Sequence, residues 1–239
     1  MTGTTEPQRF FVVHMMKTGG TTLRDRLGHH FGPPGIYPNR TDGPHIYKAI
    51  LSVDYLRDRW AVRGDEIRVV AGHFPLCVAG LLGVPFTTLT VLREPVERTL
   101  SFLRHHRERT PADHHKSLEE IYAEPLRFHG QAHNHMTKML TMTVDELDDG
   151  MLARVEYTPE RLDRAKAALR GLDLVGVQED LEPFVIELGR RFELDLGPPL
   201  HVNTSRHVDV SDEFRARIAE DNWSDIALYD YAASSIAIR

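Results

Sequence analysis

Short apolar runs alternate with longer stretches of helical pattern along this chain, and this alternation limits the possible folds more than any other feature. The runs that predict buried strands cover residues 9–14, 66–71, 87–92 and 172–177. The stretches that predict helices cover residues 23–30, 54–63, 95–107, 157–171 and 180–192, with two more segments toward the C-terminus. Such alternation predicts an α/β fold in three layers, with a central, mainly parallel sheet flanked by helices.

Two further features complete this outline. Residues 31–44 are rich in glycine and proline and predict a loop. The 239 residues contain no shift in composition that would mark a boundary, so we expect a single domain over residues 1–239.

The most informative segment follows the first predicted strand and opens the first predicted helix. It reads Lys17-Thr18-Gly19-Gly20-Thr21-Thr22. Paired glycines let the backbone turn tightly and bring N–H groups close to an anion, and the helix N-terminus adds partial positive charge. Lys17 adds a full charge, and the threonines add hydroxyl donors. The segment predicts a P-loop-like fold that binds a phosphate or similar oxyanion, although a glycine-rich turn without a ligand is the alternative.

The ATP-binding loop G-x-x-x-x-G-K-[ST] does not match this segment. Lys17 precedes the glycine pair, and the upstream glycine that the pattern requires is missing. The third predicted strand ends in Arg93, where a P-loop nucleotide hydrolase would place an aspartate for Mg²⁺. A P-loop phosphotransferase is therefore disfavoured, and we expect the anion to be bound without a metal.

A second candidate anion site follows the third predicted strand. Arg93 stands at the C-terminal end of that strand, which is the edge where open α/β sheets bind ligands. Ser101 lies about two turns into the helix that begins at Pro95. Because a guanidinium can meet a phosphate through two parallel hydrogen bonds, Arg93 and Ser101 together predict a phosphate ligand. The alternative is a surface pair between Arg93 and Glu97, with Ser101 as an ordinary helix residue.

Together these two segments resemble a known family. Lys17–Thr22 is similar to the 5′-phosphosulfate loop of sulfotransferases that use 3′-phosphoadenosine-5′-phosphosulfate (PAPS). Leu92–Arg98, followed by Ser101, resembles their 3′-phosphate element L-R-D-P-x-x-R with its later serine. The resemblance implies PAPS as the donor, 3′-phosphoadenosine-5′-phosphate (PAP) as the product, and no metal. The cofactor-binding residues that it implies are Lys17, Thr18, Gly19, Gly20, Thr21, Thr22, Arg93, Ser101, Ser205 and Arg206.

Further segments extend the resemblance from residue 9 to residue 233. Residues 134–140 (NHMTKML) resemble the N-x-Q-T-R-M-L segment of carbohydrate O-sulfotransferases, and residues 176–184 (GVQEDLEPF) resemble their G-x-x-E-x-L-x-x-F segment. Residues 203–206 (NTSR) and 222–232 are most similar to heparan sulfate 6-O-sulfotransferases. The chain departs from the usual Asp, Ser, Gln and Arg of these patterns at Glu94, Thr22, Met136 and Lys138. These departures leave cofactor use intact and leave the acceptor open.

Sulfuryl transfer to a hydroxyl needs a base for the hydroxyl proton and a cation for the charge on the departing phosphate oxygen. Lys17 can be that cation. His73 directly follows the second predicted strand, at a point where the resemblance places the catalytic histidine of carbohydrate O-sulfotransferases. We therefore expect His73 and Lys17 to be catalytic, with a structural histidine as the alternative for His73. His14, at the end of the first strand, is the second candidate base, but its position suggests a role beneath the cofactor loop.

Seven histidines cluster between residues 105 and 135, namely His105, His106, His114, His115, His129, His133 and His135. Their spacing lacks the metal-binding pattern H-E-x-x-H, and adjacent histidines on a helix diverge, so no metal site is predicted. We expect these side chains to line a solvated acceptor cleft or to lie on its surface.

Composition excludes several classes of protein. Lys and Arg total 29 against 35 Asp and Glu, and the net charge of −6 argues against a nucleic-acid partner. The lone Cys77 excludes an intrachain disulfide and a four-cysteine zinc site. The apolar run at residues 10–16 is far below the ~20 residues of a membrane span, and it lacks the flanks of a signal peptide. We therefore expect no membrane span and a cytoplasmic protein.

These observations favour a PAPS-dependent O-sulfotransferase. It would move the sulfuryl group to a hydroxyl of a carbohydrate or another small molecule by in-line displacement, with a histidine as general base. The alternative from a different class is a non-catalytic relative that binds PAP or another nucleotide. The presence of both Lys17 and His73 argues against such a loss of activity. Neither the acceptor nor the oligomeric state follows from the sequence.

Overall fold

All paired strands of the central sheet run parallel. The computed structural model describes residues 7–43, 46–148, 150–199 and 210–238. Its five-stranded sheet has the order β2-β3-β1-β4-β5. The strands are β1 (Phe10–Val13), β2 (Ile36–Tyr37), β3 (Val69–Val70), β4 (Thr87–Leu92) and β5 (Leu174–Val177). The predicted α/β fold with a mainly parallel sheet is confirmed.

Strand β1 lies at the centre of the sheet because its residues can be buried on both faces. Phe10 and Phe11 are fully buried, and β1 pairs with β3 on one side and with β4 on the other. Near-continuous apolar runs such as FFVV are typical of parallel strands that are covered by helices on both sides.

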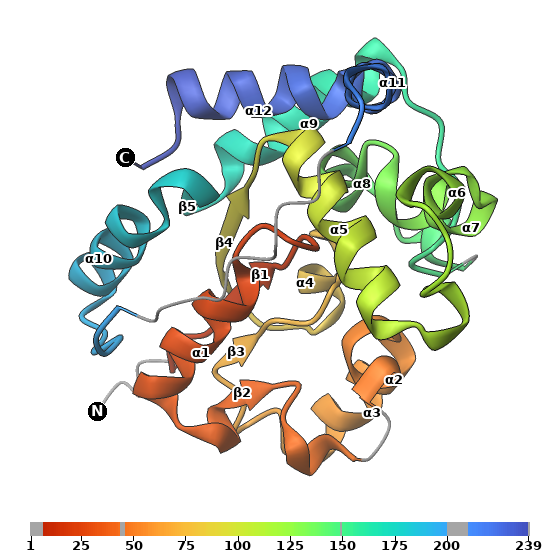
Figure 1. Cartoon of the computed structure of the whole chain (residues 1–239). Coiled ribbons are helices and arrows are strands. Elements are labelled where there is room, and N and C mark those ends of the chain that lie inside the picture. The colour runs from red at the N-terminus through yellow and green to blue at the C-terminus, as the bar shows by residue number, and fades with distance from the viewer. Residues whose placement is uncertain (1–6, 44–45, 149, 200–209, 239) are drawn as a thin grey trace, which may run out of the picture.

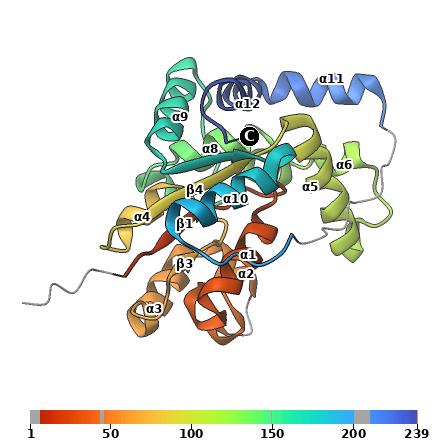
Figure 2. The same cartoon turned by 90° about the vertical axis from the view of Figure 1, so that its left-hand side faces the viewer.

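Helices cover both faces of this sheet (Figures 1 and 2). Phe10 and Val12 pack on the side covered by α1 (Gly20–Phe31) and α10 (Leu181–Phe192). Phe11 and Val13 pack on the opposite side. The helices that contribute to this second apolar cluster are α3 (Val53–Arg63), α4 (Cys77–Leu81), α8 (His135–Thr141), α9 (Pro159–Gly171) and α12 (Trp223–Ser235).

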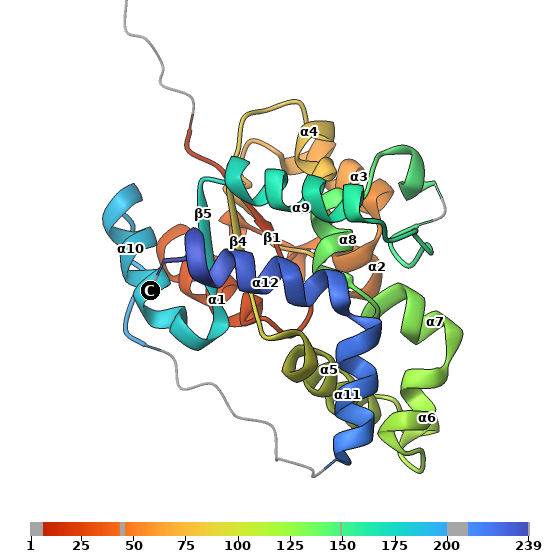
Figure 3. The same cartoon turned by 90° about the horizontal axis from the view of Figure 1, so that it is seen from above.

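A third apolar cluster lies beside the sheet rather than on it. It joins α5 (Pro95–Arg109), α6 (Leu118–Ala123) and α11 (Asp212–Asp221), which Figure 3 shows together, away from the strands. The remaining helical segments are short: α2 (Ile46–Leu51), α7 (Pro125–Arg127), a π-helical turn over Phe128–Ala132, and 3₁₀ turns. Each of the three clusters contains residues from distant parts of the chain, so the fold brings distant segments together.

The structure corrects the sequence expectations in two strands. Residues 31–44 were expected to be loop, yet Ile36 and Tyr37 form β2 and pair in parallel with β3. The strand expected over residues 66–71 is reduced to Val69 and Val70. Both differences arise because these short strands depend on pairing between distant segments and not on a local pattern. That residues 1–239 form one domain stays a prediction.

Candidate functional site

Three neighbouring strands end beside one another, and each is followed by a predicted site residue. β1 leads to Lys17, β3 leads to His73, and β4 leads to Arg93. Since β3, β1 and β4 are adjacent and parallel, their C-terminal ends share one edge of the sheet. This is the edge where ligands bind in open α/β folds.

The loop after β1 leaves the start of α1 open in the way that the predicted anion site requires. Gly19 is the N-cap residue, with φ at 93°, and no side chain in the described part of the chain caps this helix end. Its first N–H groups therefore keep the orientation that favours an anion. Thr18 is buried and donates its hydroxyl to the Met15 carbonyl at 3.1 Å, which holds the loop's shape. Thr21 is exposed, and Thr22 is buried.

Lys17 brings the loop its full positive charge. It is half-buried, and its backbone is left-handed, with φ at 68°. Burial lowers the pKa of Lys17, and the neighbouring Arg93 guanidinium lowers it further. Arg93 donates from Nη1 to the Lys17 carbonyl at 3.2 Å. The two predicted anion sites are therefore in direct contact through these residues.

Helix α5 begins at the second anion site and is tightly capped. Glu94 accepts hydrogen bonds from the backbone N–H groups of Val96 and Glu97 at 3.0 and 2.7 Å. The glutamate that replaces the usual aspartate of the resembled motif is thus an N-cap. Ser101 lies in the same helix and is 4% exposed. That Ser101 binds a phosphate stays a prediction.

His73 is held in one orientation at the end of β3. Its Nδ1 lies 2.8 Å from the His14 carbonyl oxygen, and its backbone N–H donates to the Ile50 carbonyl at 2.8 Å. A carbonyl can only accept, so Nδ1 carries the proton and Nε2 keeps a free lone pair. Burial lowers the pKa of His73, and the half-buried imidazole is therefore neutral near pH 7. These are the properties of a general base.

His14 lies directly beneath the loop 17–22, which we call the phosphate loop after its predicted ligand. Its Nδ1 donates to the Ala71 carbonyl at 3.0 Å, and its ring centroid is 4.4 Å from that of His73. A Cβ added at Gly20 would lie only 2.0 Å from His14 Cδ2, so a glycine is needed where the helix crosses this ring. Burial, and then the nearby His73, lower the pKa of His14 to about 3. His14 is a neutral support for both the loop and His73.

The structure adds His135 to the site, which the sequence analysis placed elsewhere. The Met16 backbone N–H donates to His135 Nε2 at 3.4 Å. His135 is 3% exposed, and burial holds its pKa well below the ordinary range. The expectation that this histidine lines a solvated cleft or lies on its surface is wrong, because the ring instead supports the backbone next to Lys17. The sequence signal available was its place within the resembled segment 134–140.

His106 also departs from that expectation. It is buried, and its Nε2 lies 2.8 Å from the Asp113 carboxylate, which also pairs with Lys116 at 2.7 Å. This contact fastens the C-terminal end of α5. His105, His114 and His115 are exposed, and His129 and His133 are half-buried. Among the residues that the structure describes, no three His, Cys, Asp or Glu side chains gather as a metal site.

The resembled segment 176–184 contacts both predicted anion sites, at Gly19 and at Glu94. A Cβ at Gly176 would lie 2.5 Å from the Phe184 ring, so the glycine makes room for the phenylalanine. Glu179 accepts the Glu94 N–H at 3.4 Å, where α5 begins. Leu181 lies against Gly19, within 3.1 Å of a Cβ placed there. The structure thus gives each fixed position of this pattern a packing contact or a hydrogen bond.

A second resembled segment, 134–140, contacts the site through His135 and is otherwise bonded to the start of α12. The backbone N–H of Asn134 donates to Asn222 at 2.7 Å, and its side-chain oxygen accepts the Asp225 N–H at 3.0 Å. The Asp225 carboxylate accepts the N–H groups of Met136 and Thr137 at 2.9 and 2.7 Å. We call this set of bonds the α8–α12 contact. It is buried, and its members satisfy one another.

Ser205 and Arg206, together with the rest of the segment 203–206, lie outside the described residues. Their predicted cofactor contacts stay predictions. None of the helices in the described part of the chain is both long and apolar enough to cross a bilayer.

Comparison with known proteins supports the fold. No protein-family model and no curated protein sequence matches this chain. A solved structure described as a sulfotransferase from Alicyclobacillus acidocaldarius aligns with 95% of this chain and 95% of its own. The identity is 18% and the TM-score is 0.52. The two proteins share a fold, and at this identity the likeness extends no further.

Proposed function

We propose that this protein transfers a sulfuryl group from PAPS to a hydroxyl of a small-molecule or carbohydrate acceptor. The observation that carries the proposal is the position of His73. It presents a neutral Nε2 at the same sheet edge as Lys17, Arg93 and the N-terminus of α1. A base and an anion site with two cations are the parts that sulfuryl transfer requires.

The residues present fit PAPS on the chemistry of the donors. The ligand carries anionic groups at both ends of its nucleoside, and the chain offers two cations and a helix N-terminus for them. Lys17 and the first N–H groups of α1 would hold the phosphosulfate end, and Arg93 with Ser101 would hold the 3′-phosphate. PAPS would supply the sulfuryl group, with PAP as the product. No metal enters the proposal.

The chain's own residues then have distinct roles. His73 Nε2 accepts the acceptor's hydroxyl proton as that oxygen forms its bond to sulfur. The bond between sulfur and the phosphate oxygen breaks, and Lys17 stabilises the charge left on that oxygen. The His14 carbonyl oxygen, 2.8 Å from Nδ1 of His73, accepts a hydrogen bond from the Nδ1–H group and so stabilises the imidazolium that forms. His14 itself stays neutral, since burial lowers its pKa to about 3.

Nucleotide binding provides the first test. PAP should stabilise the protein against thermal unfolding without added Mg²⁺, by about 2.7 kcal/mol when its concentration is about 100 times the dissociation constant. Stabilisation by ATP with Mg²⁺, but not by PAP, would favour the phosphotransferase instead. Labelled sulfate from PAPS should then appear on members of a panel of hydroxyl acceptors. PAP binding without transfer to any of them would favour the non-catalytic relative.

The proposal keeps the cytoplasmic location expected from the sequence. It also keeps the acceptor class broad, because the departures at Met136 and Lys138 fall inside the motif that points to carbohydrates. Fractionation of cells that express the protein tests the location directly.

A further inference from the structure

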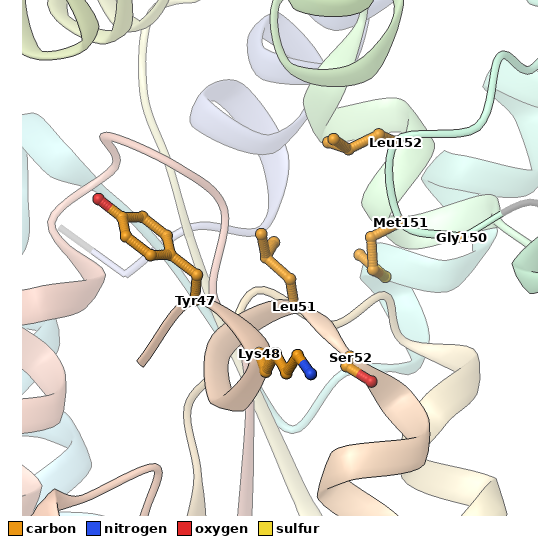
Figure 4. A pocket seen from close by; sticks show the side chains of 7 residues that line it. All are labelled: Tyr47, Lys48, Leu51, Ser52, Gly150, Met151 and Leu152. Atoms are coloured by element: carbon orange, nitrogen blue, oxygen red, sulfur yellow. The ribbon is translucent and has the colours of Figure 1, made fainter. Parts of the chain in front are cut away.

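A pocket whose α2 wall is joined to His73 through the Ile50 carbonyl points to the kind of molecule that carries the acceptor hydroxyl. Its volume is about 410 Å³, and it opens between α2 and the segment 150–152. The residues that line it are Tyr47, Lys48, Leu51, Ser52, Gly150, Met151 and Leu152. Figure 4 shows Leu51 on α2 and Met151 on the segment 150–152 at opposite sides of this space, with the polar ends of Lys48 and Ser52 together below them.

One wall of the pocket is attached to the candidate base. The His73 backbone N–H donates to the Ile50 carbonyl at 2.8 Å, and Ile50 stands directly before Leu51 in α2. The helix that carries Tyr47, Lys48 and Leu51 is thus fixed to the same residue whose Nε2 would take the acceptor's proton.

The other wall is attached to the phosphate loop. A Cβ added at Gly130 would lie 3.2 Å from Leu152 Cβ, so Leu152 packs directly on the π-helical turn. The next residue of that turn, Gln131, donates to the sulfur of Met16 at 3.8 Å, and Met16 precedes Lys17. One wall is therefore connected through Ile50 to His73, and the other is connected through Gln131 and Met16 to Lys17.

The lining favours an apolar ligand. Leu51, Met151 and Leu152 offer no hydrogen bonds from their side chains, and the polar side-chain groups of Tyr47, Lys48 and Ser52 all come from the α2 side. A sugar pressed against the apolar wall would leave the hydroxyl groups on that side without partners. Tyr47 is 73% exposed, and a ligand that covered its ring would remove apolar surface from water. The volume is near the lower end of the usual range for ligand pockets, which suits one compact group better than an oligosaccharide.

We propose that this pocket binds the body of the acceptor, and that the acceptor is a phenol or alcohol with a compact apolar group rather than a sugar. This inference rests on the proposed sulfuryl transfer. The acceptor hydroxyl would face His73, which takes its proton as the oxygen–sulfur bond forms and the sulfur–phosphate oxygen bond breaks. The apolar group would lie between Leu51 and Met151.

Binding can be tested apart from activity. The probes are 4-alkylphenols from methyl to butyl, with methyl β-D-glucoside as the sugar, titrated into protein labelled with ¹³C at the methionine methyl groups. The Met151 signal, assigned with Met151→Leu, should shift with the phenols and not with the glucoside. Affinity should rise about fourfold for each added methylene. The proposal is overturned if the chemical shift of the Met151 methyl group does not change with the phenols, or changes equally with the glucoside.

Matched variants locate the binding surface. Tyr47→Ala should weaken butylphenol binding roughly tenfold, because the ring no longer covers the ligand. Ile186→Ala removes a side chain of comparable exposure, 63%, from α10 and should change nothing. A separate pocket of about 530 Å³ is lined by His129, His133, Arg154, Val155, Glu156, Tyr157 and Trp223. If Trp223→Ala weakens binding and Tyr47→Ala does not, the acceptor lies there and the proposal is wrong.

Turnover separates this inference from the function on which it rests. With PAPS present, kcat/KM should follow the same order along the phenol series. Stabilisation by PAP together with transfer to sugars but not to phenols would leave the function standing and overturn the assignment of the pocket. Failure of PAP to bind would overturn the function, and the acceptor role with it, whatever the Met151 signal shows.

Discussion

Two regions of the chain resemble the same family in sequence, yet they use their polar groups in opposite ways. In the α8–α12 contact, Asn134 and Asp225 are buried and bond to backbone groups of the other segment. At the phosphate loop, the N-terminus of α1 has no side-chain cap among the described residues, and Lys17 is only half-buried. In the first region the polar groups bond to one another, whereas in the second the first N–H groups of the helix are left without a side-chain cap, as the proposed ligand would require.

This difference shows that resemblance in a motif can have two physical origins. The segments 134–140 and 176–184 help to hold the loops in place, and a protein that had lost its activity could still keep them. Lys17, Arg93 and His73 lie at the candidate site itself, so they are the residues that decide between an enzyme and a non-catalytic relative. The experiments below test this separation, beginning with the largest expected effect.

The substitution His73→Ala should affect rate and leave nucleotide binding and folding nearly unchanged. Removing a general base usually lowers turnover by about 10²–10⁴-fold. His73→Asn keeps some hydrogen bonding but cannot take up the proton, so it should be similarly slow. Initial rates of sulfate transfer and PAP titrations measure the two properties, and the exposed His115→Ala is the control. Normal turnover by both variants would move the base to His14 or to the 105–135 group, and unfolding of both would make His73 structural.

In the α8–α12 contact the expectation is reversed. Asp225→Ala leaves the N–H groups of Met136 and Thr137 without an acceptor, and it removes a carboxylate near the buried Arg98. Loss of a buried charge partner costs about 3–5 kcal/mol in the free energy of unfolding. Urea denaturation measures this loss, and Asp230→Ala, an exposed position on the same helix, should change stability little. A stable but inactive Asp225→Ala would place this region in the chemistry and break the comparison.

Substitution of Arg93 should have a smaller effect, and it distinguishes binding of the 3′-phosphate from binding of the 5′ end of the nucleotide. Arg93→Ala should weaken PAP binding by about 1.5–3 kcal/mol, the usual contribution of a hydrogen bond to a charged group. It should affect 5′-AMP less, because that ligand lacks the 3′-phosphate. Calorimetric titration measures both, and the exposed Arg57→Ala serves as the control. Equal losses for the two ligands would mean that Arg93 acts through the Lys17 carbonyl alone.

The smallest effect, taken per histidine and per pH unit, is a slope of stability with pH. Burial lowers the pKa of His14, His73 and His135 in the folded protein, and that of His14 from 6.5 to about 3. Below pH 6.5 the unfolded chain binds protons that the folded chain does not, so stability falls as the pH falls from 6.5 toward 3. Each histidine contributes up to about 1.4 kcal/mol per pH unit within its window. The slope should decrease in His14→Gln, and an unchanged slope would contradict the neutral support proposed for His14.

Much of the fold could be predicted because its strong elements carry local signals. Strand β4 begins and ends at the predicted residues, and α9 has Thr158 as its N-cap and Pro159 as its first residue. Strand β2 carries no such signal, since its two residues become a strand only by pairing with β3. Local pattern predicts long elements well, but it says little about a short edge strand in a loop rich in glycine and proline.

The candidate site also contains residues that could be predicted from the sequence and residues that could not. That Lys17, His73 and Arg93 gather could be predicted, because each follows a parallel strand and such strands end at one edge. The role of His135 could not, because its partner Met16 lies 119 residues away in sequence. The pocket proposed for the acceptor could not be predicted either, since α2 and the segment 150–152 meet only in the folded chain. The ligand contacts of Lys17, His73 and Arg93 remain predictions.

The left-handed backbone of Lys17 has a consequence for engineering the protein. Residues with side chains pay about 1–2 kcal/mol in this conformation, and glycine does not. Lys17 and Glu193 both adopt it, with φ at 68° and 57°. A search for stabilising replacements by backbone geometry alone would rank Lys17→Gly and Glu193→Gly together. The second position lies at the end of α10 that is far from the loop, whereas the first substitution would remove the charge proposed for catalysis in exchange for thermal stability.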